Sequence, residues 1–357
     1  MIIDRHEEFG EVMYLRDSRF ELLRIMSIIG IVLAHFSLWT PWHLENITVF
    51  NVNIVYFFRP FGQTGVYLFI LITAWFMSND IPTIDKGITR TKKILAQVIF
   101  YSIFIQIIYS WLTDNWDAKL LVKSFFPFLF NQYWFVTAYL VLIILLPYIN
   151  RIIHGISRIE HRYLILAMML FSFIFPLINN YIMGTMYSFS TICTVYVIGA
   201  YIKKYDFKLN NKLSYVAILF ALLSLYIAQV LMYLMLHRLS GIDKLNYGLM
   251  PAIISVGIFL VVKNKEKYHS VKVNWLSKNI FAVYLITVHP SISSAFFVHG
   301  LNVSELVYDF RIIIIGLVYG SLLVVATIII DKIRETFFRF ISIVFNKFSF
   351  KKFFTST

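Results

Sequence analysis

Apolar stretches long enough to cross a membrane follow one another along almost the whole chain, separated by short segments that carry most of the charges. A hydrocarbon core of about 30 Å takes roughly 20 apolar residues in helical form. Ten such stretches occur, at about residues 20–40, 62–78, 92–112, 133–150, 162–180, 186–203, 213–236, 248–263, 277–297 and 310–332. The sequence therefore predicts an all-α polytopic membrane bundle of about ten transmembrane helices.

The basic residues between these stretches alternate in density. With the N-terminus placed inside, twenty-five of the 32 Lys and Arg residues fall in inner segments and six in outer ones, and Arg24 lies within the first stretch. Because basic residues accumulate on the cytoplasmic side of membranes, this pattern predicts that both termini are cytoplasmic. The net charge of +13 is then explained by topology. The lipid bilayer is the expected partner, and no nucleic acid is required.

Composition supports this class. Hydrophobic residues make up 59% of the chain and charged residues 14%, whereas soluble domains average about 25% charged. The 35 Phe and 22 Tyr residues exclude a disordered chain, and the single Cys193 can form no internal disulfide. Residues 1–332 are expected to form the transmembrane domain. Residues 333–357, where phenylalanines alternate with Arg339, Lys347, Lys351 and Lys352, are expected to form a basic amphipathic helix on the cytoplasmic leaflet.

Ionisable groups inside a membrane are costly and usually functional. The acidic residues fall in loops or at the ends of the apolar stretches, which disfavours an ion-coupled transporter, and only His35 and His289 lie well inside. His35 follows Arg24 by eleven residues, close to three helical turns, on nearly the same face and roughly 16 Å along the axis. A neutral His35 can accept a proton; the alternative is one interhelical hydrogen bond. With no intramembrane carboxylate, we expect a backbone carbonyl or a Ser or Thr side chain to orient its ring.

Four segments carry a resemblance to a known family. They are Glu21-Leu-Leu-Arg24 through Ala34-His35-Phe36; Phe61-Gly62-Gln63-Thr64-Gly65-Val66-Tyr67-Leu68-Phe69 with Ile72-Thr73-Ala74-Trp75-Phe76; Tyr133-Trp134-Phe135-Val136-Thr137-Ala138-Tyr139-Leu140 with Pro147; and Leu276-Ser277-Lys278-Asn279 with Val283-Tyr284-Leu285-Ile286. In this order they resemble the acyltransferase family 3 membrane proteins, over about residues 18–332. The departures are Tyr67 for Asp, Ala74 for Gly and Thr287 for His. His289, two residues beyond Thr287, either substitutes through a locally irregular helix or only packs.

The resemblance implies a multi-pass enzyme of the bacterial cytoplasmic membrane that moves an acetyl group from cytoplasmic acetyl-CoA to a hydroxyl of a surface or lipid-linked glycan. Exopolysaccharide and capsule are examples of such acceptors. The expected catalytic residue is His35, as general base or as covalent acyl carrier. Acetyl-CoA enters as a substrate, and neither a permanently bound cofactor nor a metal site is expected.

Several other residues are candidates for binding the donor and the acceptor. If the first and third stretches are neighbours, Arg24 with Arg90, Lys92 and Lys93 is expected to bind the phosphates of the donor; positive-inside flanking equally explains the last three. Gln63, Trp134, Tyr139 and His289 are candidates for the acceptor site or for positions just behind it. An interfacial aromatic belt is the alternative for Trp134.

Two other classes remain as alternatives. One is a glycan transporter, flippase or polymerase of surface polysaccharide assembly, which should show several intramembrane charges or a large outer loop. The other is the unrelated membrane-bound O-acyltransferase class, in which the intramembrane histidine comes late in the chain. The early Arg24 and His35 pair disfavours the second class.

Overall fold

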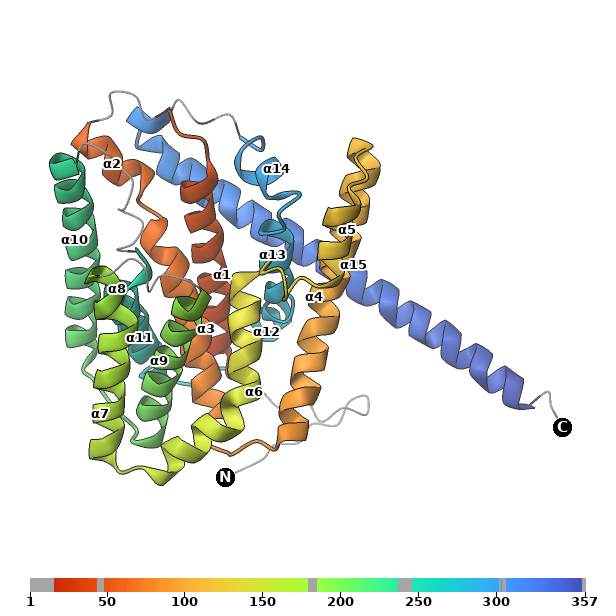
Figure 1. Cartoon of the computed structure of the whole chain (residues 1–357), viewed down its shortest axis with the longest axis horizontal. Helices are drawn as coiled ribbons and strands as arrows, with labels where there is room; N and C mark the ends of the chain where they lie inside the picture. The colour runs from red at the N-terminus through yellow and green to blue at the C-terminus, as the bar shows by residue number, and fades with distance from the viewer. Residues whose placement is uncertain are drawn as a thin grey trace.

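The computed structural model describes residues 16–43, 48–178, 185–236, 246–301, 303 and 306–354. The described residues form helices and connecting turns, with no strand among them (Figure 1). The elements are α1 (Ser18–Trp39), α2 (Val49–Val55), α3 (Arg59–Met77), α4 (Ile84–Thr113), α5 (Ala118–Phe125), α6 (Trp134–Gly155), α7 (Arg158–Met169), η1 (Leu170–Ile174), α8 (Phe175–Ile178), α9 (Thr185–Lys204), α10 (Asn211–Leu236), α11 (Leu249–Lys263), α12 (Val271–Ser277), α13 (Ile280–Thr287), α14 (Ser293–Phe297), η4 (Leu306–Tyr308) and α15 (Arg311–Phe354).

The all-helical class is confirmed. Among the described residues, six helices are long and apolar enough to cross a membrane: Ser18–Trp39, Val49–Met77, Ile84–Thr113, Trp134–Gly155, Asn211–Met235 and Arg311–Phe340. The other predicted stretches coincide with α7 to α8, with α9, with the 15-residue α11 and with the interrupted α12 to α14. The total of ten crossings and the cytoplasmic position of both termini stay predictions.

Local sequence explains where the helices at the centre of the bundle begin and break. The side chain of Asp17 caps α1 by accepting a hydrogen bond from the backbone of Arg19, and Pro41 follows the end of this helix. The stretch predicted at 277–297 is not one straight helix. Because Pro290 has no backbone N–H, the chain leaves α13 after Thr287 and resumes a helix at Ser293. The helix is therefore irregular near His289, as one of the two alternatives for this residue presumed.

Helix α1 lies inside the bundle and packs most closely against α3, with α15, α12 and α13 as further neighbours (Figure 1). Small residues allow this close approach. A Cβ atom added to Gly62 would lie 2.7 Å from the Cβ of Ala34, and one added to Gly65 would lie 2.5 Å from the carbonyl oxygen of Ser27. Such backbone proximity is typical of helix pairs in membranes. It fixes α1 and α3 as one unit.

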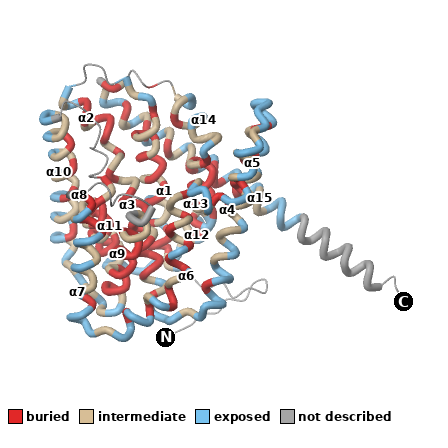
Figure 2. The backbone as a smooth tube through the Cα atoms, in the orientation of Figure 1, coloured by how far each residue is buried: buried red, intermediate tan, exposed pale blue. Residues whose placement is uncertain are grey.

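Burial follows the same arrangement. The most buried backbone lies in α1, α3 and α13, whereas α10 and the outer part of α4 expose much of their length (Figure 2). The exposed side chains of α10 include Phe220, Leu223 and Ile227, which suit contact with lipid tails rather than water. The chain therefore has the character of a membrane protein.

Helix α15 runs without a break through the predicted boundary between residues 332 and 333. It is joined to the bundle by the buried Asp331, which accepts hydrogen bonds from the Tyr101 hydroxyl at 2.5 Å and from the Asn279 amide at 2.5 Å. Beyond Asp331, α15 stays in contact with α4 as far as Phe338, whose ring lies 5.2 Å from that of Phe100, and its last part then extends away from the other helices (Figure 1). The placement of residues 333–357 on a lipid surface stays a prediction.

Candidate active site

His35 lines a small cavity with a volume of about 60 Å³ in the middle of the bundle. Two other predicted residues, Gln63 from α3 and Trp134 from the start of α6, line the same cavity. The remaining wall includes Arg59 and Asn246, which the sequence did not single out. We call this space the His35 chamber. The structure thus brings together three predicted site residues from three different helices.

The ring of His35 is oriented by aromatic contacts. It stacks on the indole of Trp39, with centroids 4.3 Å apart and an angle of 1° between the planes, and it meets Phe297 edge-on at 6.1 Å. Its Nδ1 atom is buried and has no hydrogen-bond partner among the described residues. No carbonyl or hydroxyl among the described residues holds this atom, and the expectation of such a partner stays a prediction. The contact that the structure shows on the face of the ring is with Trp39, one helical turn after His35.

A second cavity, with a volume of about 300 Å³ and mostly apolar walls, extends from the His35 chamber toward Arg24. We call it the apolar cavity. Tyr139 lines it, with its hydroxyl 3.4 Å from that of Thr73. Tyr139 is thereby separated from Trp134, although both belong to α6 and were expected at the same outer site. The apolar cavity and the chamber abut, because Ile31, Val66 and Tyr284 line both.

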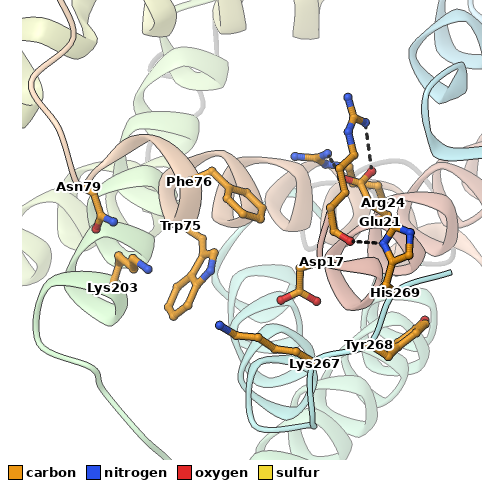
Figure 3. Close-up of a pocket in the computed structure, with 11 residues that line it drawn as sticks. Asp17, Glu21, Arg24, Trp75, Phe76, Asn79, Lys203, Lys267, Tyr268 and His269 are labelled. Atoms are coloured by element: carbon orange, nitrogen blue, oxygen red, sulfur yellow. Dashed lines mark hydrogen bonds and ion pairs between the residues drawn. The ribbon is translucent and has the colours of Figure 1, made fainter. Parts of the chain in front are cut away.

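Arg24 marks the other end of the apolar cavity and also lines a third, open cavity with a volume of about 770 Å³. Its guanidinium donates a hydrogen bond to Glu21 at 2.7 Å. Figure 3 shows these two residues on one side of the third cavity, with Trp75 and Lys203 across from them. The three cavities therefore succeed one another, and Arg24 lies where the open one meets the apolar one.

The open cavity is basic, and we call it the basic cavity. Its wall holds four cationic side chains and two carboxylates: Arg16, Arg24, Lys203 and Lys267 against Asp17 and Glu21. The two carboxylates are already engaged, since Asp17 pairs with Arg19 at 2.6 Å and Glu21 with Arg24. The Lys203 ammonium lies 4.1 Å from the centroid of the Trp75 ring. Such a wall has excess positive charge available for an anionic ligand.

Asp206 neutralises two neighbouring lysines that do not line the basic cavity. Lys263 and Lys208 donate to its carboxylate at 3.0 and 3.1 Å, and these hydrogen bonds hold the pKa of Asp206 below its ordinary value. Asp206 therefore stays ionised over the physiological range. By contrast, Lys203 and Lys267 have no carboxylate partner within the part of the chain that the structure describes.

One face of α1 connects the whole arrangement. Arg24, Ile28, Ile31 and His35 follow one another at spacings of four, three and four residues, so they share a helix face over roughly 16 Å. Arg24 lies at the basic cavity, the two isoleucines line the apolar cavity, and His35 lines the chamber. The structure therefore has Arg24 and His35 on the same face of one helix, as the sequence predicts.

The predicted partners of Arg24 lie elsewhere. Arg90, Lys92 and Lys93 are exposed on α4, which packs mainly on α5, α6 and α13, and none of the three lines any of these cavities. The cations that share a cavity with Arg24 are instead Arg16, just before α1, Lys203 at the end of α9 and Lys267 in the segment after α11. Sequence reasoning recognised Lys203 and Lys267 only as inner-loop charges, because nothing in their spacing indicates which helix ends meet.

His289 also lies outside the three cavities. Its Nδ1 accepts a hydrogen bond from the backbone of Ser291 at 3.2 Å, so its Nε2 carries the proton and donates to the carbonyl oxygen of Ser102 at 3.2 Å. Its ring packs edge-on against Tyr133, which packs in turn against the chamber residue Tyr284. This is a position behind the cavity wall, where Nδ1 holds the break between α13 and α14 and Nε2 joins that break to Ser102 on α4.

Comparison with known proteins identifies the family. A family model described as an acyltransferase domain matches residues 17–330, from the cap of α1 to Ile330 within α15. The chain belongs to acyltransferase family 3. No curated protein and no solved structure matches it.

As a member of acyltransferase family 3, the chain is a membrane acyltransferase, which decides against the transporter class. The matched range contains the α1 face and every residue that lines the three cavities except Arg16. An acyltransferase family 3 protein has to bring an acyl donor to a nucleophile away from water. A basic cavity at Arg24, an apolar cavity beside it and a histidine in the adjoining chamber provide the groups for such a reaction.

Proposed function

We propose that this acyltransferase moves an acetyl group from cytoplasmic acetyl-CoA to a hydroxyl of a surface or lipid-linked glycan, and that the transfer takes place in the His35 chamber. The observation that carries the proposal is the succession of three abutting cavities along one face of α1, from the basic cavity at Arg24 to His35. The localisation that follows is the cytoplasmic membrane of a bacterium.

The donor is held by complementary groups in this proposal. The phosphates of coenzyme A bind in the basic cavity, where Arg24 supplies a bidentate guanidinium and Lys203 and Lys267 add charge. The long, mostly uncharged arm of the coenzyme occupies the apolar cavity, where the Thr73 and Tyr139 hydroxyls can meet its amides. Its thioester then reaches Ile31, Val66 and Tyr284, at the edge of the chamber. The end that carries the basic cavity is the one that the charge pattern predicts to be cytoplasmic.

The reaction requires one proton acceptor. In the direct route His35 Nε2 takes the proton of the acceptor hydroxyl while its oxygen attacks the thioester carbonyl; the C–S bond breaks, and the proton passes to the departing thiolate. In the covalent route Nε2 first takes the acetyl group as the C–S bond breaks, so CoA leaves as the thiolate and the acetylated ring carries a positive charge; the acceptor hydroxyl then displaces Nε2, and its proton passes to the thiolate. The products in both cases are an acetyl ester and free CoA. Nε2 is assigned because Nδ1 is buried.

The acceptor lies on the side of the chamber away from the apolar cavity. Asn246 is buried there, and neither atom of its amide has a partner among the described residues. Amides such as Asn246 and Gln63 suit sugar hydroxyls, and the face of Trp134 suits the apolar face of a sugar ring. These three residues are the proposed acceptor contacts.

Membranes that contain the protein, supplied with acetyl-CoA labelled in its acetyl group, test the proposal. Label should appear in the glycan fraction and be released by mild alkali, as expected for an ester. His35→Ala should reduce incorporation at least a hundredfold, the usual minimum for losing a general base, while the protein level in the membrane stays unchanged. Incorporation near the wild-type level in His35→Ala would falsify the catalytic assignment. Label recovered on His35 without acceptor would select the covalent route.

A further inference from the structure

We propose that Ile31, Val66 and Tyr284 form a size filter that restricts the transferred group to acetyl and similarly short acyl groups. This inference rests on the proposed function, because it presumes a CoA thioester in the apolar cavity. It adds three specificity-determining residues and a physical cause for the choice of a short acyl group, which membership of the family does not give.

The position of the three residues is the first argument. Of all the residues that line the apolar cavity and the His35 chamber, these three are the ones common to both. They come from α1, α3 and α13, so they surround the junction from three sides. Any acyl group that passes from the donor side to His35 must pass between them.

The change in volume at this junction is the second argument. The apolar cavity measures about 300 Å³ and the chamber about 60 Å³. A space of the latter size holds roughly four to six groups as large as a water molecule. An acetyl group and an acceptor hydroxyl fit into that space. A hexanoyl chain with the same hydroxyl does not.

The part of the chamber wall that α1 and α3 form cannot recede to admit a longer chain. Gly62 and Ala34 both line the chamber, and the two helices are already in contact there, since a Cβ on Gly62 would lie 2.7 Å from that of Ala34. The chamber is also partly polar, because Asn246 and Gln63 line it and are buried. Methylene groups pressed against these amides would remove them from hydrogen-bonding partners at a cost in free energy.

Helix α1 offers a matched pair of variants that isolates the filter. Ile28 and Ile31 are both buried and lie one turn apart, and both line the apolar cavity, but only Ile31 also lines the chamber. Ile31→Ala and Ile28→Ala remove the same atoms from the same helix. Val66→Ala is a second variant at the filter, from α3, and Ile31→Val is a milder change should the alanine variant accumulate poorly.

The measurement is competition between acetyl-CoA, butyryl-CoA and hexanoyl-CoA, with the acyl groups released from the glycan by alkali and quantified. The wild type should transfer acetyl and exclude hexanoyl. Ile31→Ala and Val66→Ala should raise the hexanoyl-to-acetyl ratio about tenfold, the scale at which pocket size discriminates between chain lengths, and Ile28→Ala should leave it within about twofold.

The outcomes separate the filter from the function it rests on. A wild type that transfers hexanoyl as readily as acetyl, or equal shifts in Ile28→Ala and Ile31→Ala, would overturn the filter and leave the acetyltransferase assignment in place. A wild type that transfers no acyl group from any of the three thioesters would overturn the proposed function itself. A hexanoyl-to-acetyl ratio that rises in Ile31→Ala and Val66→Ala but not in Ile28→Ala supports both the filter and the proposed function.

Discussion

The imidazole of His35 lies flat against the indole of Trp39, with the two ring centroids 4.3 Å apart. Both side chains belong to α1 and are four residues apart, so the stacking is built into a single helix. Either proposed route gives His35 a positive charge for part of the cycle, and an aromatic face, that of tryptophan above all, stabilises a cation placed over it. Trp39 therefore replaces the carboxylate that orients histidine in many other enzymes.

Replacing Trp39 should slow the transfer step without weakening donor binding. Trp39→Leu keeps apolar bulk but removes the aromatic face, so we expect kcat to fall about threefold to thirtyfold, which corresponds to roughly 0.5–2 kcal/mol. Trp39→Phe, which keeps a smaller face, should lie between Leu and wild type. Steady-state kinetics with acetyl-CoA measure kcat and the KM for the donor. A rise in the KM for acetyl-CoA with unchanged kcat would contradict a positioning role.

Arg24 should bind the donor with a graded response to substitution. Arg24→Lys keeps the charge but loses the bidentate geometry, and Arg24→Ala loses both, at about 1.5–3 kcal/mol for a charge-assisted contact. Calorimetry of CoA binding to the purified protein should show that affinity is highest for the wild type, lower for Arg24→Lys and lowest for Arg24→Ala. Glu21→Gln is the control, because it frees Arg24 from its partner at 2.7 Å and should not weaken binding. Equal affinities for wild type, Lys and Ala would remove Arg24 from the donor site.

Two pairs of lysines distinguish the basic cavity from the cluster predicted on α4. Lys203 and Lys267 line the basic cavity. Lys92 and Lys93 are exposed on α4 and line neither the basic cavity nor the apolar cavity. Each double alanine variant removes the same charge. We expect the KM for acetyl-CoA to rise at least tenfold in the first variant and less than twofold in the second. The reverse result would restore the cluster that the sequence predicted.

His289 should contribute to stability more than to catalysis. His289→Ala leaves the Ser102 carbonyl and the Ser291 N–H without their partner, and a buried group that loses its hydrogen bond costs about 1–3 kcal/mol. The unfolding temperature in detergent should fall, while the rate per folded molecule at low temperature stays near wild type. A variant with wild-type stability but no activity would give His289 the catalytic role that its sequence position suggested.

The orientation of the bundle can be tested with fusions. A reporter that is active only in the cytoplasm should be active after Lys208, close to the basic cavity, and silent after Asn115, which follows α4. The 25-to-6 distribution of basic residues is the reason for this expectation. Activity after Asn115 together with silence after Lys208 would place the basic cavity outside the cell, away from acetyl-CoA.

Features contained within one helix could be predicted from the sequence. The position of Arg24 and His35 on one side of a helix follows from helical geometry alone, and both residues lie on the face of α1 that lines the cavities. The irregular backbone near His289 was likewise indicated by the adjacent Pro290. The stacking of Trp39 on His35 was readable from the same four-residue spacing, but polar partners alone were considered for the imidazole.

Features that depend on which helices are neighbours could not be predicted in this way. The expected cluster of Arg24 with Arg90, Lys92 and Lys93 presumed that the first and third stretches pack together, whereas α1 packs chiefly on α3 and α4 packs on α5, α6 and α13. In an apolar bundle each long helix is hydrophobic on most of its surface, so its pattern does not reveal its partners. Lys203 and Lys267 therefore emerged only from the structure.

The contact of Gly62 with Ala34 and of Gly65 with Ser27 also determines how substrates can come and go. Two helices whose backbones touch have no side chains between them that could rearrange to open a gap. We therefore expect the wall formed by α1 and α3, which carries His35 and Val66, to keep its shape during the reaction. Any widening of the chamber for a bulky glycan should come from the lining that α1 and α3 do not supply, above all from Trp134 at the start of α6. The rate of turnover should then depend on how readily that residue moves.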